Sequence, residues 1–230
     1  MTKTLLIVAA TDLEIKPLLH HSGFAVTHFE NLKRIQSDKI TIDVLVTNMG
    51  MVATSYQLTR ILSSHSYNYV INAGICGAFN KDFLLGDVVQ VTDDIFPEIG
   101  VDTDQGLLPL TLGNAHLEKM LVTALKNENP FSTPALQKLK EVKGITVNTI
   151  SGSAQRIDFY RKIHTPDVES MEGAAFLYVC NAFNQPCAQI RSISNYVGTL
   201  NKMDWNIELA ANNLADVLLE IVKELGAQEV

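Results

Sequence analysis

The sequence has few cysteines, no long hydrophobic segment and a deficit of basic residues, and each shortage excludes a class of protein. Its 230 residues include three cysteines, an odd number, in apolar or small-residue surroundings (Cys76, Cys180 and Cys187). They indicate buried thiols in a reducing compartment and not a disulfide framework. No segment approaches the ~20 apolar residues of a transmembrane helix. We therefore expect a cytoplasmic protein with no membrane partner.

The charge balance and the histidines exclude two further kinds of site. The chain carries 18 basic and 25 acidic side chains, for a formal net charge of −7, and nonspecific nucleic-acid binding requires the opposite, a basic surface. The six histidines are scattered without metal-ligand spacing. We expect neither a nucleic-acid partner nor a metal or other cofactor. The expected partner is a small molecule held by a few local groups.

What is present is typical of a globular α/β protein. Hydrophobic residues make up 47% of the chain and charged residues 19%, and no break in composition divides it, so we expect one domain over residues 1–230. The apolar run Leu5–Ala9 predicts a buried strand and not a signal peptide, because Asp12 and Glu14 follow at once. Apolar residues at helical spacing predict a final helix over 207–225.

The elements between these two alternate along the chain. We expect helices over 12–20, 52–63, 113–127 and 155–162, and strands over 24–29, 32–36, 40–47, 69–74, 86–91, 145–150 and 187–193. The strand at 69–74 should end in a glycine turn. A long loop is predicted over 93–112, and an exposed, irregular segment over 128–143. This alternation predicts a three-layer α/β/α fold with a mixed, mainly parallel central sheet.

Small and polar residues follow most of the predicted strands. They fall in segments 10–14, 48–51, 72–77, 151–156, 169–173 and 194–198. Ligands of such folds bind beyond the carboxyl ends of the strands, so these segments predict one shared cleft. Each signal alone has a plainer explanation. Glu14 fits a solvated acid in the first turn of a helix, and Asn195 fits a cap on a turn.

Together, these segments resemble the nucleoside phosphorylase and nucleosidase superfamily over nearly the whole chain. The resemblance rests on residues 10–14, 48–53, 72–77, 86–89, 151–154, 170–175 and 191–195. Its most specific parts are Met171–Ala175 and Arg191–Asn195. Within the superfamily, the similarity is greatest to the hydrolases of methylthioadenosine and adenosylhomocysteine and to the futalosine hydrolases.

The resemblance implies cleavage of an N-glycosidic bond through an oxocarbenium-like transition state. Water must be deprotonated below the ribose, the sugar cation must be stabilised, and the departing base must be hydrogen-bonded. By resemblance, Glu14 is the general base for water and Glu172 binds the ribose hydroxyls. Asn195 is the second catalytic residue and lies next to the purine. The other residues that the resemblance places around the substrate are Met51, Ile75, Cys76, Gly77, Gln155, Arg156 and Met171, the last beneath the sugar.

Asn195 is a departure from the enzymes that act on adenine nucleosides, which have Asp at this position. An amide can accept a hydrogen bond from N7–H and donate one to a 6-oxo group, whereas a carboxylate cannot donate. A misfit leaves buried polar groups unpaired. Asn195 therefore indicates hypoxanthine or guanine as the leaving group, which among these hydrolases fits futalosine. Gly173, where the methylthioadenosine enzymes usually carry Ala or Thr, favours the same substrate.

Three alternatives stay open. A phosphorylase acting on inosine-type nucleosides needs an anion site, and the acidic first loop around Asp12 and Glu14 would repel phosphate. A methylthioadenosine/adenosylhomocysteine nucleosidase would share the fold and both glutamates. A nucleoside-binding protein without turnover would need no base below the sugar, so the presence of both Glu14 and Glu172 counts against it.

The pocket for the 5′ substituent is the least defined part of the predicted site. Apolar candidates for its lining are Phe96, Pro97, Leu107, Leu108, Pro109 and Trp205, and Arg34 and Arg156 are candidates for a substrate carboxylate. In related enzymes a neighbouring subunit completes this pocket. The resemblance therefore implies a homodimer or a larger homo-oligomer.

Overall fold

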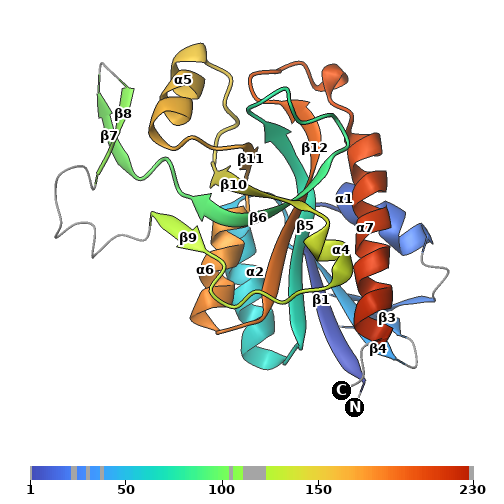
Figure 1. Ribbon diagram of the computed structural model, residues 1–230. Helices are drawn as coiled ribbons and strands as arrows, with labels where there is room; N and C mark the ends of the chain where they lie inside the picture. Colours follow the sequence, from blue (N-terminus) through green and yellow to red (C-terminus); the bar gives the residue numbers. More distant parts are fainter. Residues whose placement is uncertain are drawn as a thin grey trace.

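A computed structural model describes residues 2–21, 25–29, 32–36, 39–103, 106–110 and 123–227. It has three layers, with a twisted mixed sheet between two layers of helices (Figure 1). The sheet strands are β1 (Lys3–Ala9), β2 (Val26–Phe29), β3 (Leu32–Gln36), β4 (Ile40–Val46), β5 (Tyr69–Ala78), β6 (Val88–Ile95), β9 (Ala124–Lys126), β10 (Lys140–Thr146), β11 (Val168–Ser170) and β12 (Cys187–Tyr196). The predicted fold class is confirmed.

The centre of the sheet is parallel, and antiparallel pairs join it to the strands on either side. Strands β12, β5, β1 and β4 lie side by side in that order and run in the same direction. Antiparallel pairs attach β3 and β2 at one side and β6 at the other. The carboxyl ends of the four central strands therefore meet at one edge, where the predicted cleft was expected.

On the β6 side the sheet curls back on itself. Strand β6 pairs with β10, β10 pairs with β11, and β11 returns to pair antiparallel with the end of β5. Strands β5, β12, β6, β10 and β11 thus form a closed ring of hydrogen-bonded neighbours. This closure brings residues 168–170 beside the ends of β5 and β12, which are far from them in sequence.

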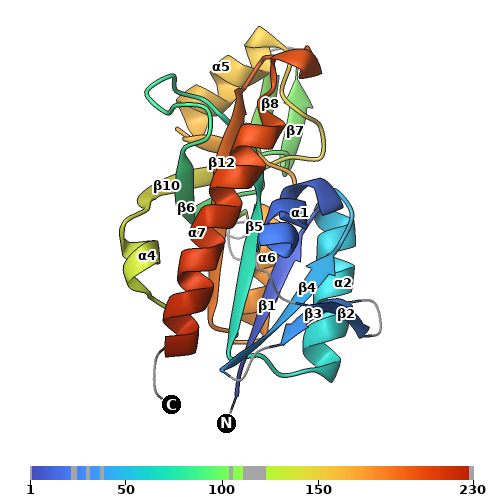
Figure 2. The same ribbon diagram turned by 90° about the vertical axis from the view of Figure 1, so that its right-hand side faces the viewer.

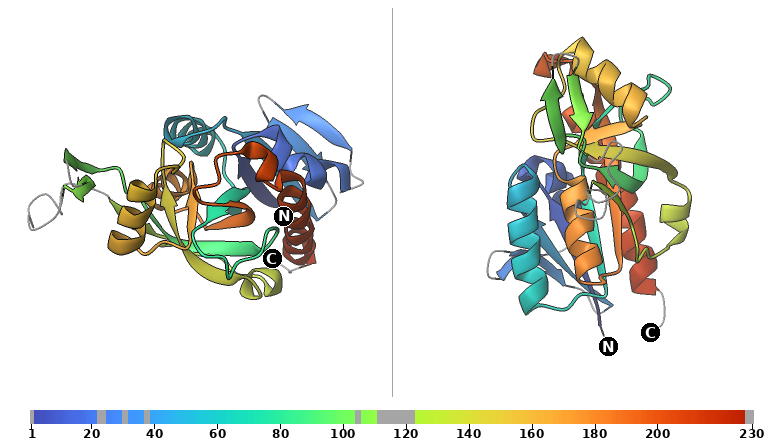
Figure 3. Two further views of the ribbon diagram at one scale, coloured as in Figure 1. Left: turned by 90° about the horizontal axis from the view of Figure 1, so that it is seen from above. Right: turned by 90° about the vertical axis from the view of Figure 1, so that its left-hand side faces the viewer.

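Helices cover both faces of the sheet. On one face lie α1 (Asp12–His21), α4 (Pro134–Gln137) and α7 (Ile207–Ala227), as Figure 2 shows. On the other lie α2 (Met51–Ser64) and α6 (Gly173–Ala182), cyan and orange in the right-hand view of Figure 3. Helix α5 (Ala154–Ile163), the hairpin β7 (Gly100–Thr103)–β8 (Gly106–Pro109) and the short 3-10 helix η1 (Lys202–Asp204) complete the described elements.

Alternation along β1 explains why both faces are covered. Leu5 and Ile7 pack in the core under α7, whereas Leu6 and Val8 pack in the core under α2 and α6, and all four are fully buried. Successive side chains of a strand point to opposite faces, so a continuous apolar run requires helices on both sides.

Across the described ranges, no helix is long and apolar enough to cross a membrane.

Several predicted boundaries were wrong. Strand β5 does not end in a turn at Gly74 but continues through Gly77 to Ala78. The predicted loop over 93–112 contains the end of β6 and the hairpin β7–β8. Strand β9 lies where the predicted helix over 113–127 ends, and residues 113–122 of that helix lie outside the described residues. So does residue 24, the first of the predicted strand over 24–29. The segment 128–143 holds α4 and most of β10, with Val142 buried.

Candidate active site

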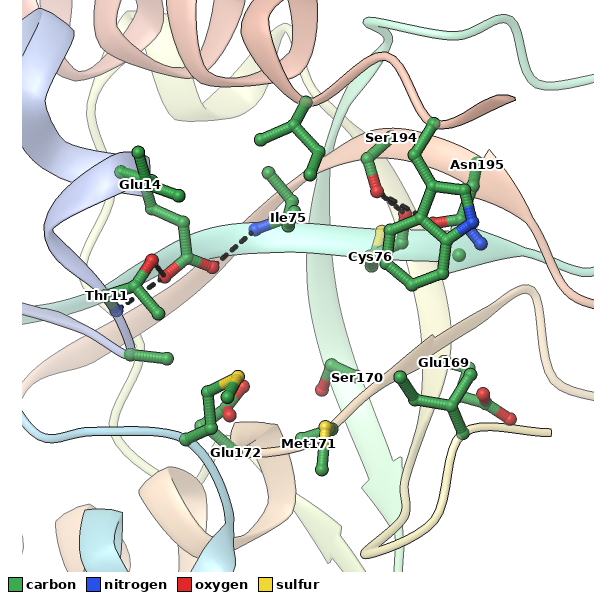
Figure 4. Close-up of a pocket in the computed structure, with 17 residues that line it drawn as sticks. Thr11, Glu14, Ile75, Cys76, Glu169, Ser170, Met171, Glu172, Ser194 and Asn195 are labelled. Carbon is green, nitrogen blue, oxygen red and sulfur yellow. Dashed lines mark hydrogen bonds between the residues drawn. The ribbon is translucent and has the colours of Figure 1, made fainter. Parts of the chain in front are cut away.

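A pocket of about 330 Å³ lies at the carboxyl ends of the central strands (Figure 4). This volume is within the range of small-molecule sites. Its walls come from the ends of β1, β5, β11 and β12, from α1, and from the segment before α7. The lining residues are Ala10, Thr11, Leu13, Glu14, Met49, Ile75, Cys76, Gly77, Ile150, Glu169, Ser170, Met171, Glu172, Ser194, Asn195, Trp205 and Ile207. The structure therefore brings five of the six predicted segments into one cleft.

Glu14 is held at one end of the pocket by three hydrogen-bond donors. Its Oε2 accepts from the backbone N–H of Thr11 at 2.8 Å and from the Thr11 hydroxyl at 3.0 Å, and its Oε1 accepts from the N–H of Ile75 at 3.1 Å. A carboxylate has about four acceptor positions. One acceptor position on Oε1 therefore remains for a ligand or a water molecule. The three hydrogen bonds also fix the orientation of the side chain.

Gly74 makes this placement of Glu14 sterically feasible. A Cβ at residue 74 would lie 2.8 Å from Glu14 Oε1 and 3.2 Å from Arg191 Nη1. The carboxylate thus occupies the space that a side chain on β5 would take. The glycine serves close approach within a strand, and not the turn that the sequence suggested.

Glu172 is the second buried carboxylate, at the N-terminus of α6. It is 7% exposed, and its Oε1 accepts from the N–H of Gly50 at 3.0 Å. Burial raises the pKa of Glu172, while the Arg191 guanidinium and the Gly50 N–H offset part of the rise and the negative charge of Glu14 adds to it. The carboxylates of Glu14 and Glu172 in one pocket create a negative field, which favours a cationic ligand or transition state.

Arg191 is a buried charged residue behind the pocket to which the sequence analysis assigned no role of its own. It is 1% exposed within β12, it donates to Asn72 Oδ1, and its Nε has no hydrogen-bond partner among the described residues. Its charge opposes the carboxylate of Glu172. The signal was available, because a charged residue inside an otherwise apolar strand is costly unless it is paired.

Asn195 lies at the opposite end of the pocket from Glu14 (Figure 4). It is 6% exposed; its Oδ1 accepts from the Ser194 hydroxyl at 2.8 Å, and its Nδ2 donates to the Tyr196 carbonyl at 3.2 Å. These bonds fix which atom of the amide is oxygen and which is nitrogen. Each atom keeps one further position, an acceptor on Oδ1 and a donor on Nδ2.

Of the other predicted substrate contacts, four line the pocket and three do not. Ile75, Cys76, Gly77 and Met171 are part of its wall. Met51 is not, because α2 begins there, immediately after the left-handed Gly50 (φ +98°); Met49, before that turn, lines the pocket instead.

Gln155 and Arg156 are also outside the lining of the pocket. They belong to the first turn of α5, which Ser153 caps by accepting from the N–H of Arg156 at 3.2 Å, and both are exposed. From this part of the chain, Ile150 contributes to the wall. The predicted segment 151–156 therefore contributes no lining residue, and the residue just before it does.

The candidates for the 5′ substituent are mostly elsewhere. Of those that the structure describes, only Trp205 lines the pocket, and Phe96, Pro97, Leu107 and Leu108 do not; the side chain of Pro109 lies outside what the structure describes. Arg34 forms a bidentate ion pair with Asp43, with N–O distances of 2.6 and 2.8 Å. Arg156 lies 3.9 Å from Glu98. Neither arginine lines the pocket.

Gly173 begins α6 where no side chain can fit. An added Cβ would lie 2.0 Å from Gln189 Nε2 and 2.3 Å from Asp94 Oδ2. Those two atoms are joined by a buried hydrogen bond of 2.9 Å, and Thr146 Oγ1 donates to Asp94 Oδ1 at 2.9 Å while accepting from the N–H of Ala174 at 2.8 Å. This network fixes the start of α6 and therefore the position of Glu172.

We expect the substitution Gly173→Ala to lower the free energy of unfolding by about 1–3 kcal/mol, because the added methyl overpacks this network. Urea denaturation measures the change. Gly226→Ala is the matched control, since its Cβ would meet no atom closer than 3.7 Å and alanine favours a helix. Equal stability of the two variants would contradict the packing described for residue 173.

The geometry of the pocket fits an organic ligand with polar groups at both ends. Within the ranges that the structure describes, no three His, Cys, Asp or Glu side chains lie close enough together to hold a metal. Cys76 is a neutral thiol, since burial raises its pKa to about 12. The acid–base and amide chemistry that these side chains offer a ligand therefore comes from the carboxylates and from Asn195, beside the hydroxyls of Thr11, Ser170 and Ser194.

Comparison with known proteins shows which protein family and which enzymes this chain resembles. The family model described as the phosphorylase superfamily matches residues 4–223. Among curated proteins, a futalosine hydrolase of Thermus thermophilus is 25% identical over 224 residues, which cover 96% of each chain. A 5′-methylthioadenosine/S-adenosylhomocysteine nucleosidase of Bacillus licheniformis is 26% identical over 191 residues, 80% of this chain and 81% of the relative.

Solved structures have the same fold. The native structure of a futalosine hydrolase of Helicobacter pylori superposes with a TM-score of 0.80 at 22% sequence identity, covering 97% of this chain and 99% of the other. The two curated relatives are similarly distant although their names differ. Overall similarity therefore does not distinguish between the two nucleosides, and the side chains of the pocket must.

Proposed function

The chain belongs to the phosphorylase superfamily, and within it we propose that the protein is a nucleosidase that hydrolyses the N-glycosidic bond of futalosine. The products would be hypoxanthine and dehypoxanthinyl futalosine, a step in the futalosine route of menaquinone biosynthesis. Relatives named as hydrolases support the reaction type. The single observation that favours futalosine is the oriented amide of Asn195 at the end of the pocket.

The two ends of the pocket would divide the reaction. Glu14, with its open position on Oε1, would take a proton from the water that forms the new bond to C1′ of the ribose. Glu172 would bind the ribose hydroxyls, and its charge would stabilise the cation that develops as the bond from C1′ to N9 breaks. Met171 would pack against the sugar between them.

Asn195 would select the base. As the bond from C1′ to N9 breaks, N7 of the departing base would take up a proton from solvent water. The free acceptor position on Asn195 Oδ1 would face the resulting N7–H, and the free Nδ2–H would face O6. The bonds from Ser194 and to Tyr196 oppose the flipped amide that a 6-amino purine would need, with oxygen toward the amino group. A site built around specific hydrogen bonds strongly rejects a ligand that mismatches them.

Three purified-protein assays test this proposal together. The protein is incubated with futalosine, inosine and methylthioadenosine, each with and without phosphate, and the free base is quantified. We expect hypoxanthine from futalosine at a rate independent of phosphate. Adenine from methylthioadenosine as the main product would overturn the substrate assignment, and phosphate-dependent cleavage of inosine would make the protein a phosphorylase.

The second candidate function is hydrolysis of methylthioadenosine or adenosylhomocysteine. It is favoured by the relatives of that name, which match the chain as well as the futalosine hydrolases do. Asn195 counts against it. A phosphorylase is disfavoured by Glu14, which points an anion into the pocket, and a binder without turnover would have no use for that carboxylate.

We also infer that the protein is a homodimer or a larger homo-oligomer. Apolar side chains surround the mouth of the pocket without being covered. Leu13 and Met49, which line it, are 65% and 67% exposed, and Val52 and Tyr56 on the adjacent α2 are 82% and 62% exposed. A second copy over this surface would bury them and close the pocket around the 5′ substituent.

A further inference from the structure

Helix α6 begins at a residue that does not cap it. Glu172 occupies the N-cap position, where Ser, Thr, Asp or Asn usually accepts a hydrogen bond from a backbone N–H of the first helical turn. The side chain of Glu172 forms no such bond with α6. Its Oε1 instead accepts from the N–H of Gly50, and the residue lines the pocket. The N–H groups of the first turn must therefore find their acceptors elsewhere.

Two hydroxyl groups from outside the helix supply these acceptors. Ser170 Oγ accepts from the N–H of Gly173 at 3.3 Å, and Thr146 Oγ1 accepts from the N–H of Ala174 at 2.8 Å. Ala174 is the second residue of α6, and its N–H is one of the two that an N-cap side chain normally binds. Thr146, at the end of β10, therefore does from a separate strand what the N-cap side chain would do.

Asp94 keeps the Thr146 hydroxyl in the role of acceptor. A hydroxyl has one hydrogen, and Thr146 donates it to Asp94 Oδ1 at 2.9 Å, which leaves the lone pairs for the N–H of Ala174. Asp94 and Thr146 are both fully buried, so solvent cannot replace either bond. Burial raises the pKa of Asp94 to about 6, and the donors Gln189 and Thr146 limit the rise. The carboxylate is therefore ionised at neutral pH, and its oxygens can only accept.

Strand register links Thr146 to the ribose end of the pocket. Thr146 pairs with Ser170 at the ends of the parallel strands β10 and β11, and the N–H of Val147 donates to the Ser170 carbonyl at 2.9 Å. The two residues between Ser170 and the start of α6 are Met171 and Glu172, and both line the pocket. A shift of the first turn of α6 would therefore move Glu172 within the pocket.

We propose that Thr146, oriented by Asp94, is a positioning residue for ribose recognition: it caps α6 in place of Glu172 and so leaves the glutamate free to bind the 2′ and 3′ hydroxyls. The inference rests on the role proposed for Glu172 but not on the identity of the base. Thr146 is buried and does not line the pocket, so it acts only through α6. Loss of its hydroxyl should weaken binding of the ribose hydroxyls and leave binding of the base at the Asn195 end unaltered.

The test uses Thr146→Val, which keeps the branched side chain and removes the hydroxyl. Inosine and 2′,3′-dideoxyinosine are compared as competitive inhibitors of futalosine hydrolysis by the intact protein, with free hypoxanthine as the probe for the base alone. For the wild type we expect inosine to bind about 10- to 100-fold more tightly than its dideoxy analogue, the range for hydrogen bonds to a charged group. In Thr146→Val this ratio should fall several-fold toward one, while the affinity for hypoxanthine stays the same. Thr146→Ser, which restores the hydroxyl, should recover the wild-type ratio.

Thr133→Val is the matched control. Thr133 is 2% exposed and caps α4 by accepting from the N–H of Leu136 at 3.2 Å, but it does not line the pocket. Its substitution removes a helix cap of the same kind and should lower stability without changing the ratio. A wild-type ratio in folded Thr146→Val would overturn the role of Thr146, and so would an equal loss of affinity for all three probes. Thr146→Cys, whose sulfur is a weak acceptor, carries the same expectation if the valine variant does not fold.

A second pair of probes separates this inference from the proposed substrate. Adenosine and 2′,3′-dideoxyadenosine are compared in the same way as inhibitors of methylthioadenosine hydrolysis. A preference for the ribose hydroxyls that appears only with this pair, and falls in Thr146→Val, would refute hypoxanthine as the base and support the role of Thr146. A ratio near one for both pairs in the wild type would overturn the inference together with the role of Glu172.

Discussion

The substitution Glu14→Gln should lower kcat for nucleoside hydrolysis by about 10²- to 10⁴-fold, the range that a positioned general base contributes. The carboxylate has two oxygens that together accept from Thr11 N–H, Thr11 Oγ1 and Ile75 N–H. An amide has one oxygen and cannot take a proton from water. It would also turn an N–H toward one of these donors, so the loss combines missing basicity with a displaced side chain.

The measurement is steady-state hydrolysis of futalosine, with kcat and KM reported separately. We expect most of the loss in kcat, because Glu14 faces the attacking water and not the purine. Glu208→Gln is the control: it makes the same chemical change in the first turn of α7, on an exposed side chain, and should leave kcat unaltered. A Glu14→Gln enzyme within a few-fold of the wild type would exclude Glu14 as the base.

Local patterns in the sequence predicted the central elements because of how those elements are buried. A central strand is apolar along its whole length because both its faces are covered, and a helix that packs on the sheet has apolar residues along one side. The run Leu5–Ala9 and the periodic segment 207–225 became β1 and α7 as expected. Signals from glycines misled for an equally physical reason. Gly74 and Gly77 indicated a turn, but they continue a strand and admit the side chains of Glu14 and Asn195.

The rest of the site depends on contacts between strands far apart in sequence, which no local pattern encodes. The pairing of β11 with β5 sets Glu169 opposite Gly77. The turn at Gly50 decides that Met49 and not Met51 faces the pocket. Resemblance supplied the loop at 151–156, but the cap at Ser153 directs Gln155 and Arg156 into the exposed first turn of α5. Strand register and helix caps therefore decide which residues face the pocket, and neither can be deduced from composition or periodicity.

The substitution Asn195→Asp should reverse the base preference of the protein. For futalosine we expect kcat/KM to fall by about 10²-fold or more, since a site that mismatches a polar group of its substrate discriminates strongly. For methylthioadenosine, kcat/KM should rise, because an acid at this position can protonate N7 and then accept from the 6-amino group. Release of hypoxanthine and of adenine from the two substrates measures both changes on one enzyme preparation.

The surroundings of residue 195 explain why the aspartate would act as an acid. One carboxyl oxygen would keep the bond from Ser194, but the other would lie against the Tyr196 carbonyl, where Nδ2 now donates at 3.2 Å. The carbonyl oxygen repels a negative charge on that carboxyl oxygen, and burial also disfavours the charged form, so the pKa of the new carboxyl should be raised; its proton would lie on the oxygen that faces N7. Its protonated form, which is the active one, would be present below that pKa and lost as the pH rises through it. Hydrolysis of methylthioadenosine by Asn195→Asp should therefore decline with rising pH over a range where the wild type's hydrolysis of futalosine does not. Parallel pH profiles for the two enzymes would mean that residue 195 does not set the protonation of the leaving base.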